Sequence, residues 1–264
     1  MDRLLVTHAR QGATLTIALE RDDKLNALDD AMTLGLQKAF GAAERDPEVR
    51  CVILIGRGRG FCAGQDLDVF RERYLAGEPI DIAGHLTRGY NLLITQIRRL
   101  EKPVIAAVNG IAAGVGVSLA LACDVRIASE AATFTLGFSR IGLIPDGGGS
   151  LLLPMTVGLG RAYELAATSE RIDASEALRL GLVNRVVPAA ALEAAAQAFG
   201  ERLNGLPAVG LALTKRAFNR TTMPQLESWL AEEAQLQQRA SESADHREGV
   251  LAFLEKRRPA FTGK

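Results

Sequence analysis

Three glycine-rich segments of the chain combine small and polar residues in a pattern that suits acid–base chemistry. They read GFCAGQDL at 60–67, NGIAAGVG at 109–116 and GLIPDGGG at 142–149. The first two follow apolar strand patterns and lead into helical ones, so their backbone N–H groups lie bare near the positive end of a helix dipole. Such groups can hold an anion or an oxyanion. For a single segment, close packing of a strand on a helix explains the glycines almost equally well.

The third segment adds a carboxylate, Asp146. A carboxylate in such a turn is a candidate general acid or base, and partial burial would raise its pKa towards such work. Pro-Asp-Gly is also a common turn sequence, and alone it would be read as a turn former. Together with the two other segments, we interpret Asp146 as catalytic. Asp124 is the second candidate acid, but it directly follows a helix and is expected to satisfy backbone groups, while Asp66 is expected to cap or orient its turn.

Other chemistries lack their signatures in this sequence. The dinucleotide fingerprint GxGxxG is not well reproduced near the first strand, and the phosphate-binding pattern GxxxxGK[ST] is absent. A serine nucleophile is disfavoured because Ser118 lacks the GxSxG elbow. We expect no metal, because no Cys or His stands at ligand spacing from any histidine, namely His8, His85 and His246.

Composition narrows the class of protein further. The 264 residues, 48% of them hydrophobic, can bury a large core, and equal numbers of basic and acidic residues (31 each) give no reason to expect nucleic acid or a membrane surface as partner. The N-terminus resembles neither a signal nor a transit peptide, so a cytoplasmic location is expected. Without a CxxC pair, the three cysteines are expected to fill the core: Cys51, Cys62 and Cys123.

The elements that must position these segments follow from hydrophobic periodicity. We predict a hairpin from strands at 4–6 and 13–19, a charged loop at 71–79, and a boundary at 203–207, where Gly205 and Pro207 interrupt the helical pattern. The boundary divides the chain into an α/β core over 1–204 and a helical region over 205–264. The other strands are expected at 51–56, at 104–108, at 124–128, at 133–136 and at 182–187. Helices are expected at 29–45, at 82–100, at 151–155, at 160–167, at 174–180, at 189–203, at 207–219, at 224–240 and at 244–257.

The three segments, in this order and spacing, resemble the successive motifs of the enoyl-CoA hydratase/isomerase (crotonase) superfamily. The similarity runs along nearly the whole chain, from 26–28 to 247–257. It implies a crotonase-like spiral of ββα units followed by a C-terminal helical trimerisation region, assembled as a homotrimer or a dimer of trimers. It also implies a substrate carried as a coenzyme A thioester, with no further cofactor.

The resemblance also assigns roles to individual residues. The N–H groups of Gln65 and Val115 match the donors that hold the thioester oxygen while an enolate forms, and Asp146 matches the acid of isomerases. Ser118 and Phe138 stand where hydratases carry two glutamates, which disfavours hydration. Val115 is bulkier than the residue more usual at its position, which could narrow the pocket. By the same matching, the residues that bind the coenzyme A thioester are Lys24, Ala27, Leu28, Ala63, Gly64, Asp66, Leu67, Gly114 and Pro145, together with Phe253 and Lys256 from a neighbouring subunit.

The expected function is isomerisation of an acyl-CoA through a thioester enolate. The preferred substrate is the ring epoxide of phenylacetyl-CoA, which would give its oxepin, and a shift of a 3-enoyl-CoA to a 2-enoyl-CoA is the close second. Two alternatives remain at this stage. One is a 2-enoyl-CoA hydratase, and the other is a non-catalytic family member that binds acyl-CoA or RNA.

Overall fold

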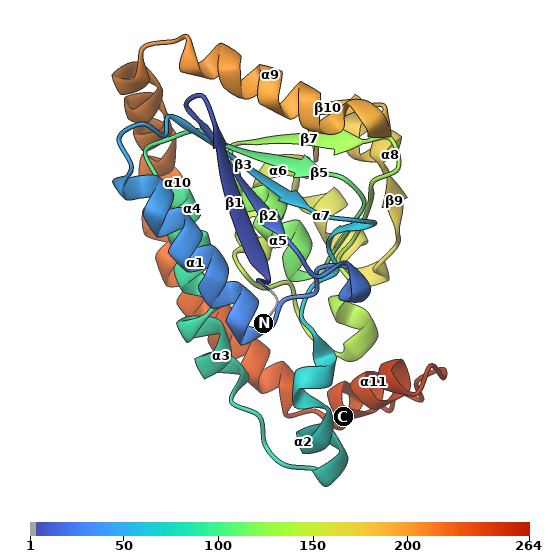
Figure 1. Ribbon diagram of the computed structural model, residues 1–264. Helices are drawn as coiled ribbons and strands as arrows, with labels where there is room; N and C mark the ends of the chain where they lie inside the picture. Colours follow the sequence, from blue (N-terminus) through green and yellow to red (C-terminus); the bar gives the residue numbers. More distant parts are fainter. Residues whose placement is uncertain (1–3) are drawn as a thin grey trace.

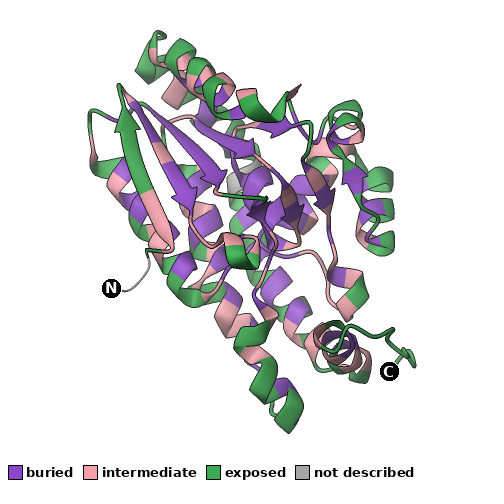
Figure 2. Cartoon of the chain, turned by 45° about the vertical axis from the view of Figure 1, so that its right-hand side comes forward, coloured by how far each residue is buried: buried purple, intermediate pink, exposed green. Residues whose placement is uncertain are grey.

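The computed structural model describes residues 4–264 and is built around a six-stranded main sheet. The strand order is β1-β2-β3-β5-β7-β10. The first two strands form the predicted antiparallel hairpin, although the first covers Val6–Gln11 and not residues 4–6, and the others pair in parallel. All residues of β3 and β5 are buried, as their continuous apolar sequences predict (Figure 2). The strands are β1 (Val6–Gln11), β2 (Thr14–Leu19), β3 (Cys51–Gly56), β5 (Val104–Val108), β7 (Val125–Ser129) and β10 (Arg185–Val187).

A second, smaller sheet stands beside the first, in the order β4-β6-β8-β9. Its first three strands each follow a strand of the main sheet within a few residues, so a long strand, a short strand and a helical segment recur three times along the chain. This recurrence is the ββα unit that the resemblance implies. The strands are β4 (Gly60–Cys62), β6 (Ile111–Ala113), β8 (Thr133–Thr135) and β9 (Ile172–Asp173).

Helices cover both faces of the main sheet. On one face α9 packs through Leu192 and Ala196 against inward-facing strand residues such as Ile53. On the other, α1 and α4 lie alongside each other and α5 runs beneath the sheet (Figure 1). The helix α1 begins where predicted, because the Asp29 carboxylate accepts a hydrogen bond from the N–H of Met32 at 2.8 Å.

The α-helices differ widely in length, from six residues to 34. They are α1 (Asp30–Arg45), α2 (Arg71–Ala76), α3 (Ile82–Arg88), α4 (Tyr90–Arg99), α5 (Val115–Ala122), α6 (Gly149–Val157), α7 (Leu159–Thr168), α8 (Ala174–Arg179), α9 (Leu192–Asn204), α10 (Ala208–Ser241) and α11 (Ala244–Leu254). Short 3₁₀ turns are η1 (Asp22–Lys24), η2 (Leu67–Phe70), η3 (Phe138–Ile141) and η4 (Ala189–Ala191).

Three sequence expectations about helices were wrong. The helix expected at 82–100 is divided at Gly89, whose ψ of −91° lies outside the helical range. The charged segment at 71–79 contains α2, held by the buried ring of Tyr74. The two helices expected at 207–219 and 224–240 form the single helix α10, which continues through Pro224 because buried contacts on both sides of the proline outweigh its cost.

The helix α10 packs onto its own chain along one face. Leu226, Leu230 and Ala234 are buried in the main core, where α10 lies against α3 and α4. Apolar side chains remain exposed elsewhere on this helix, including Val209 and Phe218. The boundary at residue 205 and the trimer stay predictions.

Buried thiols account for the three cysteines. Burial raises the pKa of Cys51, Cys62 and Cys123 to about 12, so the thiols stay protonated at neutral pH and fill the core as expected. No helix within residues 4–264 is long and apolar enough to cross a membrane.

Candidate active site

The three glycine-rich segments meet at a cavity of about 310 Å³. Gln65 comes from the first segment, Val115 from the second and Asp146 from the third, and all three line the cavity. Two larger hollows, of about 660 and 690 Å³, contain no residue of these segments. The remaining wall of the cavity is mainly apolar and includes Leu67, Phe70, Ile82, Leu86, Leu136, Phe138, Ile141, Leu143 and Phe253.

A short parallel bridge orients the backbone of Gln65. Leu28 donates its N–H to the carbonyl oxygen of Gly64 at 2.7 Å and accepts from the N–H of Asp66 at 2.8 Å. Because successive peptide groups of an extended chain point to opposite sides, the N–H of Gln65 points away from Leu28. The N–H of Val115 opens α5 and has no helical acceptor. Across residues 4–264, neither N–H meets a hydrogen-bond acceptor.

Two glycines with positive φ bring these N–H groups together. Gly64 has φ +96° and Gly114 has φ +52°. A Cβ atom on Gly64 would lie 2.9 Å from the carbonyl oxygen of Ala113, and one on Gly114 would lie 3.9 Å from the Cα of Gly64. Close packing and a donor role are therefore compatible at this place, because the same close backbone approach brings Gln65 and Val115 to one cavity.

Asp146 is buried beside these donors, with 7% of its surface exposed. Its Oδ2 accepts a hydrogen bond from Nε2 of Gln237 at 2.9 Å, whereas its buried Oδ1 has no partner among the described residues. Burial first, and then the nearby charge of Glu233, raise the pKa of Asp146 to about 7, although the Gln237 hydrogen bond acts in the opposite direction. The carboxylate is therefore poised to gain or lose a proton near neutral pH.

The long helix α10 holds the turn that carries Asp146. Gln237 bridges the turn by accepting from the N–H of Ile144 at 2.9 Å and donating to the carbonyl oxygen of the same residue at 3.0 Å. One turn earlier, the buried Glu233 accepts from the N–H of Gly148 at 2.8 Å and from the N–H of Ser150 at 3.0 Å. Sequence reasoning missed both side chains, because no motif near 142–149 points to residues about 90 positions later.

Ser118 supports the same turn from the other side. This buried serine donates its hydroxyl to the carbonyl oxygen of Asp146 at 2.6 Å and does not line the cavity. Phe138 does line it, as an apolar wall. Neither position at which hydratases carry a glutamate thus offers an acid or a base here.

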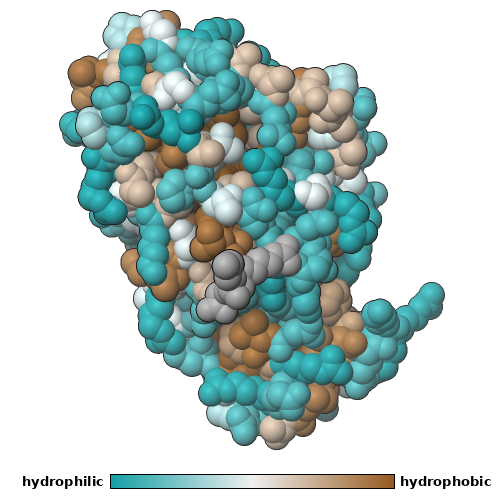
Figure 3. All heavy atoms as spheres, viewed as in Figure 1, coloured by the Kyte–Doolittle hydropathy of each residue, from teal (hydrophilic) through white to brown (hydrophobic). Residues whose placement is uncertain are grey.

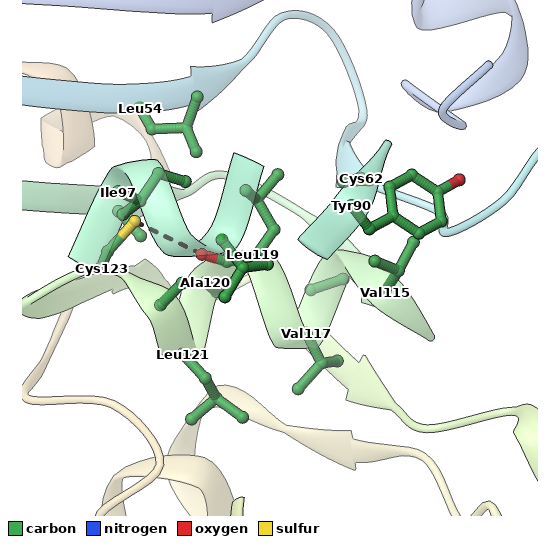
Figure 4. Close-up of a cluster of buried hydrophobic side chains, with 14 of the residues drawn as sticks. Leu54, Cys62, Tyr90, Ile97, Val115, Val117, Leu119, Ala120, Leu121 and Cys123 are labelled. Carbon is green, nitrogen blue, oxygen red and sulfur yellow. Dashed lines mark hydrogen bonds between the residues drawn. The ribbon is translucent and has the colours of Figure 1, made fainter. Parts of the chain in front are cut away.

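A polar cluster holds the side chain of Gln65. Its Oε1 accepts from Nε2 of His85 at 2.9 Å and from the hydroxyl of Tyr90, while Nδ1 of His85 lies 3.2 Å from a carboxylate oxygen of Asp30. Tyr90 stands beside Val115 and Cys62 (Figure 4). Burial raises the pKa of Tyr90 and lowers that of His85. In the sequence, His85 was weighed only as a metal ligand. The signal that could have found the pair is that His85 and Tyr90 each stand next to the buried apolar positions of an amphipathic helix, α3 and α4.

The structure also places the other predicted binding residues. Ala27 and Leu28 are buried next to the first donor, Pro145 precedes Asp146, and Lys24 pairs with Asp68 near the surface. Those that line the cavity with the three catalytic candidates are Ala63, Gly64, Leu67, Gly114 and Phe253.

The structure adds detail to three of the expected binding residues, Phe253, Lys256 and Asp66. The family resemblance implies that Phe253 and Lys256 contact the coenzyme A thioester from a neighbouring subunit. Phe253 also lines the cavity of its own chain, and Lys256 lies exposed just beyond α11. The Asp66 carboxylate caps η2 and pairs with Arg21 at 2.7 Å, as the turn-orienting role predicts.

Asp124, the second candidate acid, has a structural role. Its Oδ2 accepts from the N–H of Val104 at 2.8 Å and pairs with Nζ of the buried Lys215 at 2.7 Å. It therefore ties the start of β5 to α10, as expected for a carboxylate that satisfies backbone groups.

Fold and site together define a crotonase-type acyl-CoA enzyme. The chain belongs to the enoyl-CoA hydratase/isomerase family, whose model matches residues 9–264. It is 42% identical, over the full length of both chains, to 1,2-epoxyphenylacetyl-CoA isomerase of Escherichia coli K12, and 44% identical to a probable enoyl-CoA hydratase of Rhodobacter capsulatus over 94% of each. A crystal structure of an enoyl-CoA hydratase from Mycobacterium avium subsp. paratuberculosis superposes with a TM-score of 0.86 at 40% identity and covers 98% of this chain and 99% of that one.

Proposed function

We propose that this enzyme isomerises acyl-CoA thioesters by moving a proton between two carbons of the acyl group. The observation that carries the proposal is that Asp146 is the only carboxylate among the described residues that line the cavity. A single acid suffices for a double-bond shift, because the same group removes and returns the proton. The unpartnered Oδ1 and the pKa near 7 suit both steps.

In this mechanism the thioester carbonyl oxygen accepts hydrogen bonds from the N–H groups of Gln65 and Val115. Asp146 takes a proton from the carbon next to the carbonyl group, and the electron pair of that C–H bond passes into the enolate, whose oxygen carries the charge. The proton then returns to the γ-carbon, which leaves the double bond conjugated with the thioester. Fixed donors of this kind contribute about 10²–10³ in rate each, and a positioned base about 10²–10⁴.

For the acyl group we propose the ring epoxide of phenylacetyl-CoA. In this substrate the ring C–C bond that the epoxide oxygen bridges breaks to give the seven-membered oxepin, while Asp146 moves a proton from the α-carbon to a ring carbon. A linear 3-enoyl-CoA is the second substrate. The relative from Escherichia coli supports the first choice. The small volume of the cavity, at the low end of the range for ligand pockets, and its apolar wall suit a compact ring or a short chain.

Hydration of a 2-enoyl-CoA is the competing activity, because several relatives carry that name. Activating water with one carboxylate and protonating carbon with another would require a second acid, and Ser118 and Phe138 supply none. A panel of three thioesters separates the activities: the ring epoxide, a 3-enoyl-CoA and a 2-enoyl-CoA. We expect turnover of the first two; rapid hydration of the third with neither isomerisation would overturn the proposal.

A non-catalytic RNA-binding role makes a different prediction in the same experiment. It requires no turnover of any thioester and binding of RNA that weakens steeply with salt. The balanced charge of 31 basic and 31 acidic residues gives it little support.

We also propose that the chain assembles as a trimer or a dimer of trimers through its helical C-terminal region, residues 205–264. The exposed apolar side chains of α10, including Phe218 at 72% exposure, support an assembly that covers them. Sedimentation equilibrium should give a multiple of three times the 28.2 kDa subunit mass, and a stable monomer would contradict the proposal.

A further inference from the structure

The acyl cavity ends against a side chain that also borders a second hollow. Tyr74 is the only residue, of those the structure describes, that lines both the 310 Å³ cavity and the neighbouring hollow of about 690 Å³. The second hollow lies between α2, α10 and α11. These helices meet at the lower end of the molecule, where apolar residues gather around η2, α2 and α3 (Figures 1 and 3).

One side of this wall is held firmly. His246, at the start of α11, is fully buried, and its Nδ1 lies 2.6 Å from the carbonyl oxygen of Ile141. The helix α11 packs closely on the turn after η3: a Cβ atom on Gly142 would lie 2.9 Å from the Cα of His246, and one on Gly249 would lie 2.7 Å from the Cα of Ile141. The imidazole therefore has little freedom to move.

On the other side, Tyr74 contacts His246 through one hydrogen bond and one ring contact. The hydroxyl of Tyr74 lies 2.8 Å from Nε2 of His246, and the two rings meet edge to face with centroids 5.4 Å apart. Because the carbonyl oxygen of Ile141 can only accept, Nδ1 of His246 carries the proton, and Nε2 of the neutral ring accepts from Tyr74. Tyr74 itself belongs to α2, a helix of only six residues.

We propose that Tyr74, latched to His246, closes the acyl cavity against the second hollow and so sets the largest acyl group that the enzyme accepts. This inference rests on the proposed acyl-CoA site. While Tyr74 is hydrogen-bonded to His246, an acyl chain too large for the 310 Å³ cavity meets the tyrosine ring. Removing the ring joins the two spaces and lets a long acyl tail extend between α2 and α11.

The test is the binding of saturated acyl-CoA thioesters, which does not depend on isomerase activity. Calorimetry on the full chain measures the affinity for butanoyl-CoA and dodecanoyl-CoA. The parent protein should prefer butanoyl-CoA. Tyr74→Ala should raise the ratio of dodecanoyl to butanoyl affinity at least about tenfold, the discrimination that even one methylene can produce in a tight pocket. Tyr74→Phe, which keeps the ring and loses the latch, should fall between the two.

Controls separate this effect from damage to the fold. Tyr163→Ala removes a tyrosine that is 74% exposed on α7, and should leave the ratio unchanged. An unaltered affinity of Tyr74→Ala for butanoyl-CoA would show an intact site; should that variant not fold, Tyr74→Leu should raise the ratio at least about threefold. An unchanged affinity ratio in the Tyr74 variants, or equal affinities of the parent for the two thioesters, overturns this inference but leaves the proposed function standing. Failure of the parent to bind either thioester overturns the proposed function and, with it, this inference.

Discussion

Replacing Gln237 with methionine removes the amide group that donates to Oδ2 of Asp146 across 2.9 Å. This hydrogen bond favours the ionised carboxylate, so its loss raises the pKa of Asp146 above the present value of about 7. A hydrogen bond to a charged group contributes about 1.5–3 kcal/mol, which corresponds to an increase of about one to two pKa units. The variant therefore needs a higher pH than the parent to ionise its base.

The effect on activity follows from the ionised fraction of Asp146. As a base, Asp146 acts in its ionised form, so kcat/KM rises with pH through the pKa. For an increase of about one and a half units, the ionised fraction at pH 7.5 falls about eightfold and recovers near pH 10. The assay is the pH profile of kcat/KM with the best substrate of the thioester panel.

A matched control comes from the next residue of α10. Gln238 does not contact the turn that carries Asp146; its side chain contacts the N–H of Ala83 at 3.2 Å and the carbonyl oxygen of Ile80 at 3.3 Å. Gln238→Met should keep the parent profile. If Gln237→Met gave an acidic limb that coincides with the parent's, or a uniform loss at every pH, the reasoning that Gln237 tunes Asp146 would be refuted.

Three further predictions concern the same site. Gly64→Ala should lower kcat/KM about 10²-fold or more, because the added Cβ would lie 2.9 Å from the Ala113 carbonyl oxygen and displace the oxyanion donor N–H of Gln65. As a control, Gly160→Ala should retain activity, because its added Cβ would meet nothing within 4 Å. Tyr90→Phe should lower kcat more than it raises KM, because the hydroxyl steadies the residue that supplies that donor; steady-state kinetics with an unchanged kcat would argue against this role. Asp146→Asn should stabilise the protein at pH 8 by up to about 4 kcal/mol relative to the parent. The pKa of Asp146 is about 7 in the folded protein against 3.8 in the unfolded chain, so the parent loses stability as the pH rises from 3.8 to 7. Urea unfolding measures the free energy of unfolding at pH 4 and pH 8, and an equal change between these pH values in both proteins would contradict this prediction.

The glycine-rich turns and the long strands before them could be predicted from sequence, because clusters of glycine and continuous apolar runs are local signals, whereas the short strands β4 and β6 within these segments were not predicted. Gly64 and Gly114 are examples, and the β3 and β5 strands behind them were assigned from their apolar sequences. That these segments meet at one cavity is a matter of long-range strand order, which came from the family resemblance and not from periodicity. Only the order of the strands in the main sheet brings the N–H groups of Gln65 and Val115 to the same cavity.

The supports of the site lay beyond sequence reasoning. Glu233 and Gln237 contact the turn that carries Asp146 from the part of α10 beyond Pro224, and α10 continues without a break through this proline, where the sequence predicted an interruption. Likewise, Tyr90, which donates its hydroxyl to Oε1 of Gln65, is the first residue of a new helix that starts after the chain divides at Gly89. In each case tertiary packing overrode the local propensity on which the prediction was based.

The central claim is that Asp146 moves a proton at the carbon next to the thioester, and hydrogen exchange tests it most directly. The protein is incubated with a saturated acyl-CoA in D₂O, and deuterium at the α-carbon is followed by mass spectrometry. The parent should catalyse exchange at a rate that rises with pH through about 7, and Asp146→Asn should be slower by about 10²–10⁴-fold. Exchange by Asp146→Asn at the parent rate would contradict the account.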